Sequence, residues 1–293
     1  MISSSRANFS SSCLTRRAFI ASGTICAGFV RPVWAQAAAP VLTISWSKNI
    51  LAIEHPEIPG NRIEIWYLEA YCRPGSTDRD WHETTIGHET SLVAASEDGK
   101  RLELRCVLKD GVIVTHRITA SNDDVEFQLT AHNPTAEASQ VHWAQPCIRV
   151  APFVQLSKDE YIRSCFVFLD GRLERMPTRD WATHARYTPG QVWGAPGVDQ
   201  RDLNPRPLNP RTPSNGLIGC FSGDGKWLLA TAWEPYQELF QGVIGCIHSD
   251  FRIGGLQPGQ TKRVRGKIYL LPADVPGLLK RYEADFPEHR QSR

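Results

Sequence analysis

A carboxylate and an imidazole lie at the ends of two neighbouring predicted strands. Glu234 follows the apolar strand that ends in Trp233, and His248 opens the polar run His248-Ser249-Asp250 at the end of the next strand. A carboxylate that accepts a proton and an imidazole that donates one act together if both reach the same substrate. An ordinary role at a solvated strand end remains the alternative for each residue.

Asp250 projects from the same side of its strand as His248, because residues i and i+2 share one face. The two side chains fit a turn in which the carboxylate holds the imidazole, an acid–base role, or a pair of metal ligands. Turn structure is the preferred interpretation. We therefore expect no metal and no other cofactor.

Two proton-transfer schemes use residue types that this sequence contains. Opening the ring of a sugar hemiacetal needs a base for the anomeric hydroxyl and an acid for the ring oxygen. Elimination from a uronic acid needs a base at C5, a cation such as Arg149 or Arg186 beside the carboxylate, and an acid such as Tyr187 or Tyr236. Both schemes remain open.

Aromatic and polar side chains near these positions indicate a surface for a sugar, since aromatic rings stack on sugar faces. The expected substrate-binding residues are Trp233, Tyr236, Gln237, Arg149, Tyr187, Trp193 and Asp250.

Motifs of other catalytic classes are missing from the sequence. It has no Gly-x-Ser-x-Gly elbow, no phosphate-binding loop, no dinucleotide-binding glycine pattern and no His-Glu-x-x-His. The near balance of 33 basic and 31 acidic residues gives no reason to expect nucleic acid as a partner.

The elements that must position these residues are strands. From Val41 onward, apolar and polar residues alternate with a period of two, and turn signals follow at short intervals. Asp98-Gly99 and Asp110-Gly111 predict tight hairpins, because glycine adopts the positive φ that such turns require. The pattern predicts an all-β fold, an antiparallel sandwich of about 14 to 18 strands.

Residues 171–215 interrupt this pattern. The segment holds seven of the 20 prolines and few aliphatic residues, and it predicts a lid-like loop over a binding surface, with a disordered linker as the alternative. Residues 275–286 have the spacing of a short C-terminal helix. The expected single domain spans 38–286, and 287–293 is expected to be a flexible tail.

Residues 1–37 have the features of a twin-arginine signal peptide. Arg16-Arg17 is followed by a modest apolar run and by Ala35-Gln36-Ala37, a cleavage signal. The apolar run is too short for a membrane anchor, which needs about 20 residues. We therefore expect a periplasmic or secreted protein with no membrane anchor in its mature form.

Six of the eight cysteines lie beyond the predicted signal, and several interrupt apolar strands. Free cysteine is among the most buried residue types. We expect buried thiols in preference to disulfides, although the oxidising compartment leaves one or two disulfides open.

Two stretches resemble the galactose mutarotase-like β-supersandwich superfamily. Asn133-Pro134-Thr135 before the strand with His142 is similar to its central motif, and Trp233-Glu234-Pro235-Tyr236-Gln237 before Leu256-Gln257-Pro258-Gly259 is similar to its C-terminal segment. The resemblance implies a β-supersandwich in which Glu234 is the general base and His142 lies near the general acid. His142 is displaced from the family pattern, so His248 is a second candidate.

The residues and the resemblance together predict an exported carbohydrate-active protein, an epimerase- or lyase-like enzyme with acid–base chemistry on a mono- or oligosaccharide. The catalytic candidates are Glu234, His142 and His248. A glycan-binding β-sandwich protein without catalysis is the alternative.

Overall fold

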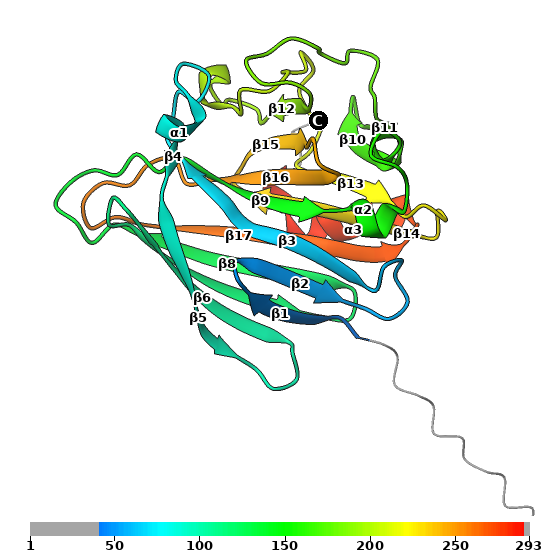
Figure 1. Ribbon diagram of the computed structural model, residues 1–293, viewed down its shortest axis with the longest axis horizontal. Coiled ribbons are helices and arrows are strands. Elements are labelled where there is room, and N and C mark those ends of the chain that lie inside the picture. The colour runs from blue at the N-terminus through cyan, green and yellow to red at the C-terminus, as the bar shows by residue number, and fades with distance from the viewer. Residues whose placement is uncertain (1–40, 290–293) are drawn as a thin grey trace, which may run out of the picture. The chain divides into compact units, whose positions relative to one another are not determined.

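The computed structural model describes residues 41–289, which form seventeen strands in two antiparallel sheets (Figure 1). The predicted all-β class and antiparallel sandwich are confirmed. The described residues belong to one compact unit. The predicted signal peptide lies outside the described residues.

The first sheet has the order β1-β2-β3-β9-β16-β15-β12, with β4 paired to β3. Its strands are β1 Thr43–Ser47, β2 Ile50–Glu54, β3 Arg62–Cys72, β4 Thr85–Ile86, β9 Trp143–Arg149, β12 Gln191–Gly194, β15 Tyr236–Gln241 and β16 Cys246–Arg252.

The second sheet has the order β11-β10-β13-β14-β17-β8-β7-β6-β5. Its strands are β5 His88–Ala95, β6 Arg101–Leu108, β7 Ile113–Ala120, β8 Asp124–His132, β10 Cys165–Leu169, β11 Arg172–Arg175, β13 Ile218–Phe221, β14 Trp227–Glu234 and β17 Thr261–Pro272.

Short helices lie at the strand ends. They are α1 Trp81–Thr84, α2 Ala151–Val154 and α3 Val275–Asp285, with 3-10 turns η1 Tyr161–Ser164, η2 Gln200–Asp202 and η3 Pro287–His289. None of the described helices is long and apolar enough to cross a membrane.

The predicted hairpins form where the Asp-Gly pairs lie. Gly99 between β5 and β6 has φ 67°, and Gly111 between β6 and β7 has φ 90°. These left-handed conformations are easy for glycine and strained for other residues. The local sequence thus sets the register of three consecutive strands.

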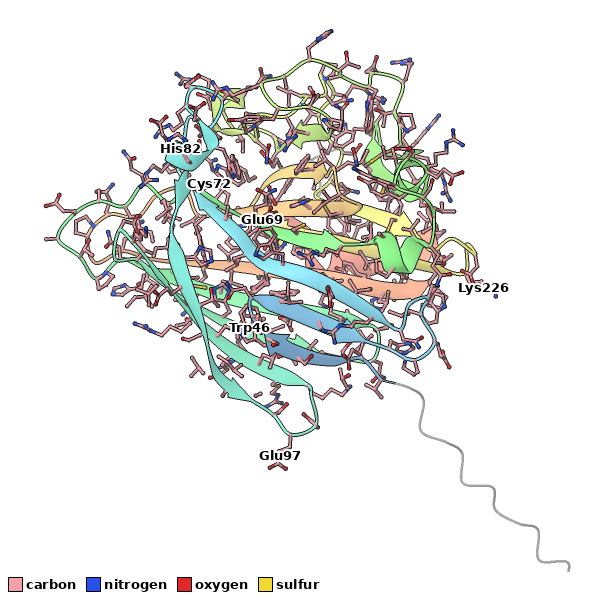
Figure 2. All side chains as sticks on the ribbon, viewed as in Figure 1. Trp46, Glu69, Cys72, His82, Glu97 and Lys226 are labelled. Atoms are coloured by element: carbon pink, nitrogen blue, oxygen red, sulfur yellow. The ribbon has the colours of Figure 1, made fainter. Side chains whose placement is uncertain are left out.

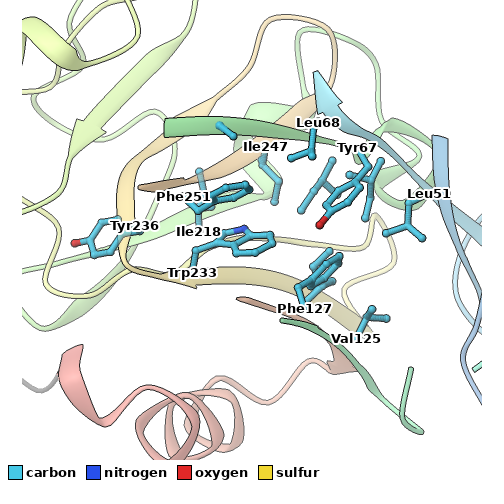
Figure 3. Close-up of a cluster of buried hydrophobic side chains, with 14 of the residues drawn as sticks. Leu51, Tyr67, Leu68, Val125, Phe127, Ile218, Trp233, Tyr236, Ile247 and Phe251 are labelled. Carbon is cyan, nitrogen blue, oxygen red and sulfur yellow. The ribbon is translucent and has the colours of Figure 1, made fainter. Parts of the chain in front are cut away.

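The main core lies between the two sheets, where alternate residues of both are apolar (Figure 3). Trp233 of β14 packs against Phe127 of β8 and Phe251 of β16, with ring centroids 5.1 and 4.7 Å apart. Tyr67 of β3 packs against Phe127 from the opposite sheet. These large rings join the sheets and leave the other face of the first sheet free for polar residues.

The predicted C-terminal helix is α3, which forms a second core with the second sheet. Leu278 and Tyr282 are buried with Phe166, Leu228 and Tyr269 from strands β10, β14 and β17. The flexible tail was predicted to begin at residue 287. In the structure, residues 287–289 form η3, and the His289 side chain is only 7% exposed. Residues 290–293 of that tail lie outside the described residues.

Residues 171–215 contain β11, β12 and η2, so part of the predicted loop joins the sheets. β12 pairs with β15 at the edge of the first sheet. Figure 1 shows the rest of the segment on the side of β15 and β16 that faces away from β17. It therefore covers the face of the first sheet that the main core does not use.

Candidate active site

Polar residues of three strands gather on the outer face of the first sheet. Ile148 of β9 pairs with Ile247 of β16, so the register sets Cys147 beside His248. Residues two apart share a face, which adds Gln145 on β9 and Cys246 and Asp250 on β16. Ile148 and Ile247 point to the main core instead. The register between β9 and β16 therefore places the polar side chains on the outer face of the first sheet and the apolar ones on its core face.

The neighbouring strands extend this face. Glu238 of β15 pairs with Asp250, and Phe240 pairs with His248. On the other side, the pairing of β3 with β9 shifts between Trp66 and Ala70, and Leu68 has φ 39°. A bulge of this kind re-aims side chains. Glu69 lies within it, and its side chain lines the polar cavity described next (Figure 2).

A cavity of about 340 Å³ stands over this face. Glu69, Gln145, Cys147, Cys246 and His248 form its floor. Its remaining walls come from α1, from the β15–β16 turn and from the loops of 171–215; they include Trp81, Tyr187, Asn204, Arg206, Phe240 and Ile244. Three of these wall residues, Tyr187, Asn204 and Arg206, come from the segment that the composition singled out.

Two thiols and one imidazole meet in the floor. One ligand atom each from Cys147, Cys246 and His248 lies within 4.8 Å of the others. Cys246 Sγ is 3.3 Å from His248 Nε2. The hydrogen bond between the two thiols raises the pKa of Cys147 and lowers that of Cys246. Sulfur and nitrogen donors in this arrangement are able to hold a soft or borderline metal ion.

The second ring nitrogen of His248 points to polar groups. Gln145 Nε2 lies 3.2 Å from Nδ1, and Asp250 Oδ1 lies 3.8 Å from it. The ring stacks on Phe240 with centroids 4.9 Å apart. These contacts fix the orientation of the imidazole.

Glu238 and Asp250 form a carboxyl pair beneath the floor, and both are fully buried. Burial raises the pKa of Glu238 to about 7. Burial and the charge of Glu238 also raise the pKa of Asp250. Two adjacent carboxyl groups in such surroundings cannot both ionise, so the pair holds a proton. The Asn204 backbone N–H donates to Glu238 Oε2 at 2.9 Å and ties the covering loop to the sheet.

Arg206 and Glu69 bring opposite charges to the cavity. Burial raises the pKa of Glu69, and the nearby His248 opposes that shift. The Arg206 guanidinium lies over the Tyr187 ring at 5.7 Å and donates to the Pro189 carbonyl at 3.2 Å. Within residues 41–289 no carboxylate pairs with Arg206 at 4 Å or less. This cation is available to an anionic ligand.

Glu234 lies in a different place from His248. Its Oε2 is 2.5 Å from His289 Nε2, and His289 also contacts the Tyr282 hydroxyl. Glu234, Tyr236 and His289 line another cavity of about 360 Å³. The expected partners of Glu234 were His142 and His248, and neither lines that cavity.

His142 lies just before β9, half-buried, with Nδ1 4.0 Å from Asp202 Oδ2. Burial and the charge of Arg252 lower its pKa. It does not line the cavity of His248. The structure thus distributes the three predicted catalytic residues over three separate surroundings.

The predicted binding residues divide into two groups. Tyr187 lines the cavity of His248, and Asp250 lies behind that imidazole. The others are elsewhere: Trp233 and Trp193 are buried in the core, Tyr236 lies beside His289, Gln237 donates to the Asp202 carbonyl, and Arg149 pairs with Glu64.

Sequence reasoning missed Glu69, Gln145, Cys147, Cys246 and Arg206. Two stretches of sequence contained three of these five residues, Gln145, Cys147 and Cys246. Gln145-Pro146-Cys147 and Cys246-Ile247-His248 place polar or thiol side chains at alternate positions of buried strands. Glu69 had no such signal, because its orientation depends on the bulge in β3.

The six cysteines from Cys72 to Cys246 are all free and buried. Their predicted burial is confirmed. Two of them, Cys147 and Cys246, also line the cavity.

Solved structures similar to this chain include galactose mutarotase-like proteins, as the sequence resemblance predicted. A putative aldose 1-epimerase from Escherichia coli K12 is 11% identical, with a TM-score of 0.42, over 80% of this chain and 99% of its own. A galactose mutarotase-like protein from Lactobacillus casei ATCC 334 is 9% identical, with a TM-score of 0.41, over 78% and 100%.

An alpha-mannosidase from Enterococcus faecalis V583 is 8% identical, with a TM-score of 0.47, over 86% of this chain and 30% of its own. No protein-family model and no curated protein sequence matches the chain. Likenesses at this level of identity and TM-score do not indicate a function for this chain.

Proposed function

We propose that the protein is an acid–base enzyme that removes a proton from a carboxylated sugar bound in the cavity under 171–215. One observation carries the proposal. Glu69 and Arg206 line the same cavity, and the guanidinium has no carboxylate partner within the described residues. A base and a cation without a carboxylate partner in one cavity suit a substrate that carries both a carboxylate and an acidic C–H bond.

The reaction begins when Glu69 accepts the proton from the carbon next to the substrate carboxylate. The electron pair of that C–H bond moves into the carboxylate, and Arg206 stabilises the added negative charge. Return of a proton from solvent to the opposite face of that carbon gives an epimer, and Glu69 then releases the abstracted proton to solvent. Loss of the oxygen at the next carbon gives an unsaturated sugar instead, and Tyr187, which lines the same cavity, supplies the proton to that oxygen.

The cavity walls suit a sugar ring. Trp81, Tyr187 and Phe240 offer aromatic surface, and about 340 Å³ is enough for a monosaccharide unit. A glycan-binding protein without catalysis would present Trp181, Trp193 and Tyr187 as an exposed aromatic platform, and these residues do not form one. Trp193 is fully buried and contacts Trp181 with ring centroids 6.1 Å apart.

Exchange of Glu69 for Gln tests the proposal. We expect Glu69→Gln to lower turnover of a uronate-containing saccharide by about 10²–10⁴-fold, because the amide cannot accept the proton. Two readouts cover both outcomes of the reaction: ultraviolet absorbance of an unsaturated product, and uptake of solvent deuterium at the substrate carbon by NMR. The matching neutral sugar, which lacks the carboxylate, should be a poor substrate.

Glu234→Gln is the matched control, since Glu234 is a part-buried carboxylate beside a histidine in another cavity. We expect it to retain turnover. If Glu234→Gln loses activity and Glu69→Gln retains it, the chemistry belongs to the Glu234–His289 pair, and the role of Glu69 is wrong.

A further inference from the structure

We propose that Cys147, Cys246 and His248 bind a divalent transition metal ion, with Zn²⁺ as the best fit, in the floor of the cavity. This site does not depend on the proposed reaction, because metal binding needs neither Glu69 nor a substrate. The three residues come from β9 and β16, which pair with each other in the middle of the first sheet. The ligands therefore stand on rigid neighbouring strands.

The spacing of the ligand atoms matches a tetrahedral site. Zn–S distances near 2.3 Å and Zn–N distances near 2.0 Å place two ligand atoms about 3.5–3.8 Å apart. Cys246 Sγ and His248 Nε2 are 3.3 Å apart, and all three atoms lie within 4.8 Å of one another. Small side-chain rotations are enough to surround an ion.

The donor set selects the kind of metal. Two sulfurs and one imidazole nitrogen are ligands for zinc and for other soft or borderline ions, whereas magnesium and calcium prefer oxygen. Three protein ligands leave a fourth position, as in catalytic zinc sites. All three residues line the cavity, so that position opens toward the space in which a substrate would bind.

The groups behind His248 are an independent observation that favours a metal. A histidine bound to a metal through Nε2 presents an N–H at Nδ1, which needs an acceptor. Gln145 Oε1 is buried and has no hydrogen-bond partner within the described residues, and the buried Asp250 oxygens have none there apart from the carboxyl group of Glu238. Asp250 is 0% exposed and Gln145 is 4% exposed.

Both acceptors lie in reach of Nδ1. Asp250 Oδ1 is 3.8 Å away, and rotation of the Gln145 amide brings its oxygen to the position that the nitrogen occupies at 3.2 Å. Unsatisfied buried acceptors are unfavourable in a folded protein. A metal-bound His248 would satisfy one of them.

A disulfide between the two cysteines is the competing explanation. Cys246 pairs with Arg149, so Cys147 is its diagonal neighbour two residues along β9. Diagonal neighbours in an antiparallel pair have Cα atoms about 7–8 Å apart, beyond the usual range of a disulfide. This register disfavours a disulfide without backbone movement, while the three ligand atoms lie close enough together to share an ion.

Zinc titration of the reduced mature chain tests the site. We expect one Zn²⁺ per chain by elemental analysis after dialysis. Substitution with Co²⁺ should produce the sulfur-to-metal charge-transfer band and the tetrahedral visible bands. Cys246→Ser should weaken Zn²⁺ binding by more than 100-fold. Asp250→Asn, which keeps all three ligands, should weaken it by about 10–100-fold.

Cys106→Ser is the matched control, because Cys106 is also buried in a strand but lies in the second sheet and contacts Thr90 Oγ1. Circular dichroism of each variant shows that it is folded. Binding of Zn²⁺ by Cys246→Ser as tightly as by the Cys106→Ser control would overturn the proposal. So would a Cys147–Cys246 disulfide, seen by mass spectrometry, in protein recovered from cells.

The two proposals fail separately. Loss of turnover in Glu69→Gln with unchanged Zn²⁺ content supports both of them. Wild-type protein that turns over its substrate but binds no Zn²⁺ in the titration overturns the metal site alone.

Discussion

At the scale of single residues, the buried polar side chains indicate where the functional site lies. His248, Asp250, Glu238 and Gln145 are all at most 4% exposed, although they are polar or ionisable. Burial of such groups is unfavourable unless they are paired. Their concentration on one sheet face is the reason to place the function there.

His116 is a different kind of buried polar residue, because it joins the two sheets. Its Nδ1 lies 2.9 Å from the Tyr67 hydroxyl and its Nε2 lies 3.3 Å from the Tyr71 hydroxyl, so β7 is linked to β3. Burial, and then the charge of His88, lower the pKa of His116 to about 3. Tyr67, Tyr71 and His88 are the titratable groups around it.

The lowered pKa predicts how stability depends on pH. The folded state binds the His116 proton less well than the unfolded state, whose pKa is near 6.5. The contribution of buried neutral His116 to the free energy of unfolding is therefore fully present above pH 6.5 and is lost as the pH falls toward 3. His116→Gln removes this proton uptake and should make the free energy of unfolding less sensitive to acid.

Urea unfolding of wild type and His116→Gln, measured from pH 6.5 down to 4.5, checks the prediction. The wild-type free energy of unfolding should fall by roughly 2 kcal/mol more than that of the variant over this range. Parallel pH dependences would show that His116 is accessible to protons in the folded state.

At the scale of elements, the register between β9 and β16 sets both the apolar core and the polar cavity. The same pairing of β9 with β16 sends Ile148 and Ile247 to the core and Cys147 and His248 to the cavity. A shift by one residue would exchange the two faces. The apolar core thus fixes the position of the polar site.

The helix α3 stabilises the outer face of the second sheet in a comparable way. Leu278 is fully buried in the second core, and Arg281 pairs with Asp123 at 2.6 Å and with Asp124. We expect Leu278→Ala to lower the free energy of unfolding by about 2–4 kcal/mol, because it removes buried methyl groups and leaves a cavity.

Lys280→Ala is the control for that substitution, since Lys280 is exposed on the same helix. Its effect should stay within about 0.5 kcal/mol. Denaturant midpoints of both variants give the comparison. Equal effects of the two substitutions would mean that α3 is not packed as the structure shows.

At the scale of the whole molecule, the predicted export signal determines where the chemistry takes place. Arg16-Arg17 and Ala35-Gln36-Ala37 are the basis of that prediction. We propose that the mature protein works in the periplasm or outside the cell.

Replacement of both Arg16 and Arg17 by Lys should keep the protein in the cytoplasm, because the twin-arginine pathway reads that pair. Immunoblots of cell fractions measure the distribution of full-length and cleaved chain. Arg6→Lys, also in the predicted signal, is the control and should be exported normally. Export of the double variant would show that the segment is not a twin-arginine signal.

The sequence by itself determined the strands, the hairpins and the class of fold. Alternating apolar residues and glycines at positive φ act over a few neighbouring residues, so β5, β6 and β7 are readable from local pattern. The Pro-rich segment 171–215 was recognised as unusual for the same reason. His248, Asp250 and Tyr187 were also identified as candidates from local pattern.

Only the tertiary structure decided which of those residues meet. Glu234 ends β14 in the second sheet, whereas β15 follows it and His248 lies inside β16 of the first sheet. The preferred interpretation of His248-Ser249-Asp250 as a turn at a strand end is therefore wrong. Glu234 therefore meets His289, and His248 meets Cys147, Cys246 and Gln145. Sheet assignment and register arise from contacts between distant segments, and a bulge in β3 aims Glu69, so no local pattern could reveal this cavity.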